Sequence, residues 1–92
     1  MAERKWRVEE SSSHIVQMEH DYWSGRAVIW LEGIEIFRRG LTLVDFGLVH
    51  RFYVEDVEYT IHVICHPLAY FRYELWDGDF ELKPMTPDDH HE

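Results

Sequence analysis

Histidines are the side chains here with the widest chemical range, because neutral imidazole ligates zinc or copper and also acts as a general base. His62, Cys65 and His66 lie near the end of one predicted strand, and His50 lies on the strand expected to pair with it. Metal binding through His50, His62 and His66 is therefore one hypothesis. Residues three apart on a strand point to opposite faces, so His62 and Cys65 cannot share an ion unless the strand bends. The alternative is a solvent-facing His62 and a packed Cys65, and we assign no metal ligand and no cofactor.

Nucleophilic catalysis requires an exposed Ser or Cys with a base and an orienting acid, and the nucleophile elbow G-x-S-x-G does not occur. His20 with Asp21, and Asp45 with His50, are candidate His–Asp pairs. Such pairs arise by chance in a chain with seven histidines and 18 acidic residues. The five glycines are scattered over turn positions, and none belongs to a G-x-G-x-x-G phosphate loop. We therefore expect a protein that binds rather than catalyses, with no catalytic residue.

The segment HDYWSGR, residues 20–26, is the strongest candidate for a binding surface. Tyr22 and Trp23 lie beside Arg26 at a predicted hairpin tip, and these residue types are enriched in binding hot spots. If they are exposed, they form a contact patch for a protein or peptide. The alternative is that Tyr22 or Trp23 folds back over the open end of the core. We take Tyr22, Trp23 and Arg26 as the candidate binding residues.

Aromatic residues with polar tips are numerous: Trp6, Trp30, Trp76, Tyr53, Tyr59, Tyr70 and Tyr73. In a β-sandwich most of these fill the core or line its rim. If the sheets stand apart, the same residues line an apolar cavity, which makes a small apolar ligand the second hypothesis. A chain of 92 residues leaves little volume for such a cavity.

Charge and cysteine content limit the partners and the compartment. Eighteen acidic against nine basic side chains give a net charge of −9, which repels nucleic acid and anionic lipid surfaces. Cys65 is the only cysteine, so no disulfide can form within the chain. The charged start and the lack of a long apolar run indicate neither an export signal nor a membrane span. We expect a soluble, cytoplasmic protein.

The elements that must position these residues are strands, because the dominant hydrophobic period is two. The pattern is clearest over residues 57–65, which with 52–54 predict a hairpin closed at Glu55-Asp56. Asp77-Gly78 predicts another hairpin turn, and Ser24-Gly25 and Glu32-Gly33 predict two more. The expected strands cover residues 6–8, 14–19, 26–31, 34–38, 41–46, 52–54, 57–65, 71–75 and 79–82. Since no helical period is present, we predict an all-β protein, an antiparallel sandwich of about eight strands.

One domain accounts for the chain at this length. We divide it into an N-terminal extension (residues 1–5), a β-sandwich domain (residues 6–83) and a polar tail (residues 84–92) expected to be disordered. A sandwich has edge strands with unpaired backbone groups, so association between copies of the chain is a further expectation.

The order and spacing of several short motifs resemble one repeat of the Fas apoptotic inhibitory molecule family. The resemblance covers about residues 6–82 and is carried by Trp6-Arg7-Val8, His14-Ile15-Val16, Glu19-His20, Ser24-Gly25-Arg26, Glu32-Gly33, residues 35–39, Phe52-Tyr53-Val54, Ala69-Tyr70, Tyr73-Glu74-Leu75 and Asp77-Gly78.

This resemblance implies an unconventional antiparallel β-sandwich, in agreement with the strand pattern. The family is not known for catalysis and has been linked to protein–protein contact and to protection against aggregation. Animal members usually have two such domains in tandem, whereas this chain has one, which places the receptor-linked and anti-apoptotic roles in doubt. The resemblance therefore implies a protein-interaction module.

Overall fold

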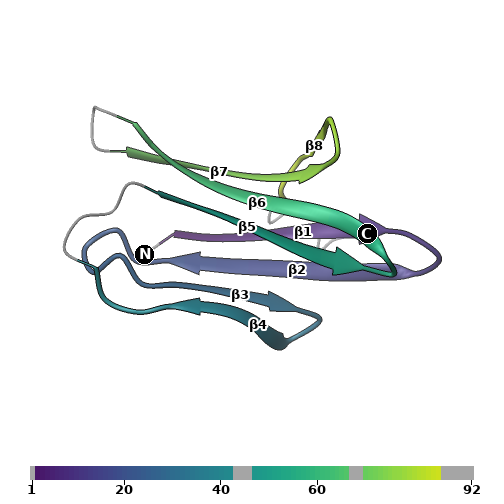
Figure 1. Ribbon diagram of the computed structural model, residues 1–92, viewed down its shortest axis with the longest axis horizontal. Coiled ribbons are helices and arrows are strands. Elements are labelled where there is room, and N and C mark those ends of the chain that lie inside the picture. The colour runs from purple at the N-terminus through teal and green to yellow at the C-terminus, as the bar shows by residue number, and fades with distance from the viewer. Residues whose placement is uncertain (1, 43–46, 67–69, 86–92) are drawn as a thin grey trace.

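The computed structural model describes residues 2–42, 47–66 and 70–85. These residues form two four-stranded antiparallel sheets and no helix, which confirms the predicted all-β sandwich (Figure 1). The first sheet contains, in spatial order, β1 (Ala2–Glu9), β2 (Ser13–His20), β3 (Ala27–Leu31) and β4 (Ile34–Arg39). The second contains β5 (Gly47–Val54), β6 (Val57–His66), β7 (Tyr70–Asp77) and β8 (Phe80–Leu82). Each sheet is a meander of strands consecutive in sequence.

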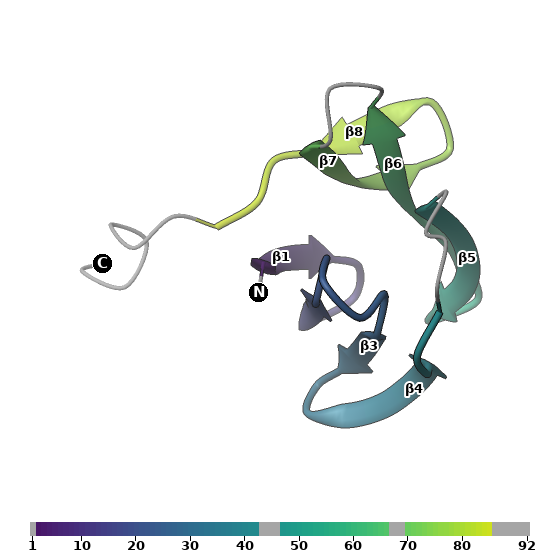
Figure 2. The same ribbon diagram turned by 90° about the vertical axis from the view of Figure 1, so that its left-hand side faces the viewer.

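The period-two pattern places one face of each sheet in a shared core. Figure 2 shows the two sheets curving around that core, with β1 and β7 on the same side. The fully buried large side chains include Trp6 and Met18 from the first sheet and Tyr59, Ile61 and Leu75 from the second. Their alternation with exposed or half-buried neighbours follows from the opposite orientation of successive side chains on a strand.

Two hairpin turns adopt the left-handed backbone that two-residue β-turns require. Glu32 and Gly33 have φ of 53° and 80°, and Glu55 and Asp56 have φ of 51° and 70°. Both turns lie where the sequence predicts them. The β7–β8 turn is shifted by one residue from the prediction, because Asp77 pairs with Phe80 and leaves Gly78 and Asp79 as the loop.

Several predicted boundaries differ from the structure, among them that of β5, which begins at Gly47 rather than at residue 52. The opening strand begins at Ala2 rather than at residue 6, so residues 2–5, which we had placed in an extension, are part of the first sheet. Full pairing with β2, from Ala2 opposite His20 onward, provides the backbone hydrogen bonds of this stretch. A strand was also predicted over residues 41–46, but Leu41 and Thr42 lie outside any strand and residues 43–46 lie outside the described part.

The C-terminal stretch returns to the first sheet. The backbone amide of Met85 donates a hydrogen bond to the carbonyl of Lys5, 2.7 Å away. This contact satisfies one carbonyl on the outer edge of β1. Of the predicted tail, residues 86–92 lie outside the described residues.

Candidate binding site at the open end of the core

On the inward faces of β1, β2 and β7, apolar core side chains give way to Arg4, His20 and Tyr73 at one end of the sandwich. On β1 the row of Val8 and Trp6 continues through Arg4 and Ala2. On β2 the row of Val16 and Met18 ends at His20, and on β7 the row of Leu75 continues through Tyr73 and Phe71. The core therefore opens to the surface between two sheets at this end, lined by groups that can make both apolar and polar contacts.

A pocket of about 280 Å³ lies at this open end. Its lining comprises Ala2 and Arg4 from β1, Tyr22 from the β2–β3 loop, and Tyr70, Phe71 and Tyr73 from β7. Four aromatic rings and one guanidinium thus surround a space that two sheets and one loop build together. We refer to these six residues as the aromatic pocket.

Arg4 supplies the charge of the aromatic pocket. The Cζ atom of Arg4 lies 5.1 Å from the ring centroid of Tyr73, within the range of a cation–π contact. Its Nη1 donates a hydrogen bond to the carbonyl of Glu3 at 2.8 Å. Among the described residues, the pocket lining includes no carboxylate. A positive group is therefore held at the mouth of a pocket in a strongly acidic protein.

His20 forms the rear support of the aromatic pocket. Its side chain is fully buried, and Nδ1 lies 2.7 Å from the hydroxyl oxygen of Tyr73, a hydrogen-bond distance. The His20 ring also meets Phe71 in a T-shaped arrangement at 4.6 Å between centroids. Phe71 and Tyr73 of β7 are thus both contacted from behind by one residue of β2, which reduces the entropy that a ligand would have to remove.

The β2–β3 loop presents Tyr22 and Trp23 in a fixed conformation. The Asp21 carboxylate accepts a hydrogen bond from the backbone amide of Trp23 at 3.0 Å, which lowers the pKa of Asp21. The amide of Gly25 donates to the carbonyl of Asp21 at 2.7 Å, and Gly25 has a φ of 77° that suits glycine. Tyr22 is 48% and Trp23 88% exposed, with 6.2 Å between ring centroids. These two side chains therefore do not cap the core.

Arg26 does not line the aromatic pocket. It lines a separate depression of about 190 Å³ together with Glu19, Asp21, Val28 and Arg38. Of the three predicted binding residues, Tyr22 alone is in the described lining of the aromatic pocket, and Trp23 lies next to it. That Tyr22, Trp23 and Arg26 contact a partner stays a prediction.

The structure does not bring the predicted histidines together. His50 packs against the ring of Phe37 at 4.5 Å, and burial lowers its pKa. His66 stacks on Tyr70 at 4.4 Å, beside the aromatic pocket. Neighbouring β5 and β6 pair His50 with Ile61 and His62 with Val49, so His50 and His62 occupy opposite faces of the sheet. Cys65 is exposed rather than packed, and no group of His, Cys, Asp or Glu in the described residues has the arrangement of a metal site.

Sequence reasoning missed Arg4, His20 and Phe71 as site residues. Arg4 was assigned to an extension, and His20 was considered as a partner for Asp21 and as the first residue of the candidate binding segment, but not as a buried support. The signal was present in the period of two, because Arg4 precedes the buried Trp6 by two residues and His20 follows the buried Met18 by two. Polar residues on an inward row mark the place where the core ends.

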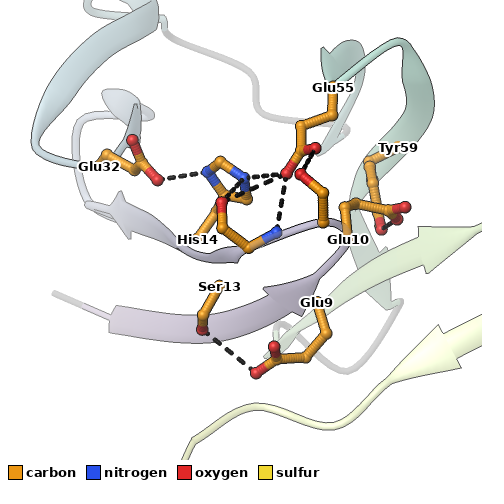
Figure 3. A network of polar contacts seen from close by, with 9 residues as sticks. Glu9, Glu10, Ser13, His14, Glu32, Glu55 and Tyr59 are labelled. Atoms are coloured by element: carbon orange, nitrogen blue, oxygen red, sulfur yellow. Dashed lines mark hydrogen bonds and ion pairs between the residues drawn. The ribbon is translucent and has the colours of Figure 1, made fainter.

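The opposite end of the sandwich carries a polar cluster centred on His14 (Figure 3). His14 on β2 lies between Glu32 of the β3–β4 turn and Glu55 of the β5–β6 turn, with Nε2 2.6 Å from the Glu55 carboxylate. Ser12 Oγ is 3.2 Å from the same Nε2 and Glu32 contacts the other ring nitrogen, Nδ1, so Ser12, His14 and Glu32 share the order of contacts of a catalytic triad. However, the hydrogen bond to Glu55 raises the pKa of His14, and a protonated imidazole between two carboxylates is a poor general base.

The alternative of a small-ligand carrier predicted a closed apolar cavity of several hundred Å³. The aromatic pocket is an indentation at the end of the sandwich, with a charged residue and a half-exposed tyrosine in its lining. Its volume is below the about 300–1,000 Å³ of typical small-molecule sites. Its shape suits one or two side chains of a partner better than an enclosed lipid or cofactor.

Fold and site together define an all-β sandwich domain with an aromatic pocket at one open end. A model of the Fas apoptotic inhibitory molecule (FAIM1) family matches residues 2–91, which is nearly the whole chain. The chain therefore belongs to the Fas apoptotic inhibitory molecule family, as the order of its sequence motifs indicated. No curated protein sequence matches it significantly. In the described part of the chain, no helix has the length and apolar character needed to cross a membrane.

Proposed function

We propose that this chain is a non-enzymatic protein-interaction module that binds a partner protein or peptide through the aromatic pocket and the adjoining Trp23. The observation that carries this proposal is the exposure of large aromatic side chains around a preformed pocket. Trp23 is 88% exposed, and Tyr22 and Tyr70 are about half exposed on two sides of the pocket. Tryptophan, tyrosine and arginine are the residue types that dominate binding energy in interfaces.

The surroundings of these side chains favour binding over a role in folding. Trp23 lies outside the core, so it contributes little burial within the monomer. The hydrogen bonds of the loop hold its backbone in one conformation before a partner arrives. Preorganised aromatic groups lose little entropy on binding, which increases the affinity that a small contact area provides.

Compartment and partner class belong to the same proposal. The net charge of −9 disfavours nucleic acid and anionic membranes, and the single cysteine fits a reducing compartment. We place the module in the cytoplasm with a protein or peptide as its partner. Association between copies through the sheet edges stays a secondary possibility that light scattering at high concentration tests.

Affinity capture from native lysate tests the proposed function. Wild-type protein is compared with a Tyr22→Ala/Trp23→Ala variant and with a control variant, Tyr53→Ala/Phe80→Ala, whose side chains are 63% and 78% exposed away from the pocket. We expect a partner that wild type and control retain and the pocket variant loses. Equal capture by all three folded proteins would reject the aromatic pocket as the binding site.

A further inference from the structure

The charge of the aromatic pocket is opposite to the charge of the protein. The chain as a whole carries −9, yet the part of the pocket lining that the structure describes contains Arg4 and no carboxylate. No ion pair joins Arg4 to an acid among the described residues. A guanidinium has five N–H donors, and the hydrogen bond from Arg4 to the carbonyl of Glu3 uses only its Nη1 group. Donors remain for an anionic group from outside.

Arg4 is held in position for such a contact. Its guanidinium lies over the ring of Tyr73, and Tyr73 is fixed in turn by His20. An arginine that stacks on an aromatic face loses little further freedom when it forms parallel hydrogen bonds to a carboxylate. The rings of Tyr22, Tyr70 and Phe71 border the same space, so an apolar side chain can enter beside the carboxylate.

The volume sets the size of the occupant. A space of about 280 Å³ equals about nine water volumes of about 30 Å³ each, enough for one large side chain and one carboxylate.

Recognition of a chain terminus typically uses a concave arrangement of backbone N–H groups. The described lining of the aromatic pocket is instead made of side chains from two sheets and one loop, with Arg4 as its cationic group. This arrangement suits an acidic side chain within a peptide.

We propose that the aromatic pocket recognises an acidic side chain next to an aromatic one in a partner peptide, with the carboxylate on Arg4 and the ring among Tyr22, Tyr70 and Phe71. This inference rests on the proposed function, because it specifies the partner of the same site. It runs against the expectation from net charge alone, which would favour a basic partner. Repulsion by the remaining acidic surface is screened beyond about 8 Å at physiological ionic strength.

Two blocked tetrapeptides test this inference by NMR titration of the ¹⁵N-labelled full chain. One is acetyl-Gly-Glu-Phe-Gly-amide, and its uncharged match has Gln in place of Glu. We expect the Glu peptide to shift resonances of the pocket residues and to bind about tenfold more tightly than the Gln peptide. The preference should disappear in Arg4→Gln and persist in Arg7→Gln, whose arginine is exposed on the opposite face of β1.

The other outcomes separate the inference from the proposed function. Equal binding of both peptides at the pocket overturns the carboxylate inference and leaves a peptide-binding module. Tighter binding of acetyl-Gly-Gln-Phe with a free carboxyl end than of the Glu peptide overturns it in favour of a chain terminus. Absence of pocket shifts with either peptide at millimolar concentration also overturns it, while capture from lysate tests the proposed function independently.

Discussion

The Nε2 atom of His14 lies 2.6 Å from a carboxylate oxygen of Glu55, a residue 41 positions further along the chain. His14 belongs to the first sheet and Glu55 to the turn between β5 and β6 of the second. The backbone amide of Ser12 also donates to Glu55, at 3.2 Å, and the Ser11 hydroxyl donates to the same carboxylate. One glutamate thus links the turns of both sheets at the end opposite the aromatic pocket (Figure 3).

The first prediction concerns the pH dependence of stability. Hydrogen bonds from Ser11 and His14 lower the pKa of Glu55 to about 2, and the bond to Glu55 raises the pKa of His14 above 6.5. The stability from Glu55 is therefore present above its ordinary pKa of 4.5 and is lost as the pH falls toward 2. The stability from His14 is present below pH 6.5 and is lost as the pH rises through its raised pKa.

Urea denaturation of wild type and His14→Gln from pH 4 to pH 9 checks this expectation. The wild-type free energy of unfolding should be highest between about pH 4.5 and pH 6.5 and decline on the alkaline side. His14→Gln should be less stable at pH 6 and lack the alkaline decline. A wild-type dependence of stability on pH in Glu55→Gln would contradict the role of Glu55. It would assign the raised pKa of His14 to Glu32, the other carboxylate that faces it.

The sequence predicts the strands and turns of the sandwich better than the contacts at its two ends. The period of two located most strands, and the left-handed pairs Glu32-Gly33 and Glu55-Asp56 located two turns, because these are local preferences of the backbone. The pairing of His14 with Glu55 depends on how two sheets pack, and nothing local encodes that packing. The period of two does place Arg4 on the inward row of β1, but its contact with Tyr73 of the other sheet depends on the same packing.

The second prediction distinguishes exposed from buried tryptophan. Trp23 is 88% exposed, so Trp23→Ala should change the free energy of unfolding by no more than about 0.5 kcal/mol. Trp6 is fully buried in the core, and Trp6→Ala should cost about 3 to 5 kcal/mol. Thermal or urea unfolding measures both. A large loss of stability in Trp23→Ala would mean that this side chain packs against the domain.

The third prediction concerns the conformation of the β2–β3 loop. Asp21→Ala removes the acceptor for the Trp23 amide. Because a hydrogen bond of this kind contributes about 1 kcal/mol, the Trp23 amide should exchange its hydrogen about fivefold faster or more in this variant. Asp21→Asn retains a side-chain oxygen at the same place and should stay close to wild type. Hydrogen exchange followed by NMR reports the Trp23 amide directly. Equal exchange in all three proteins would assign the order of the loop to its other bonds.

The fourth prediction concerns Gly47, the first residue of β5. Its φ is 95°, and a Cβ atom there would overlap the carbonyl oxygen of Val63 on β6. Gly47→Ala therefore combines a left-handed backbone penalty with a clash against a rigid strand and should cost at least about 2 kcal/mol. Gly33→Ala is the matched control, because Gly33 also has a positive φ of 80° but a Cβ would meet no atom within 4 Å. Its cost should be about 1 kcal/mol, from the backbone alone. Urea unfolding measures the difference, and equal costs would show that β5 can move away from β6 at Gly47 without losing its pairing.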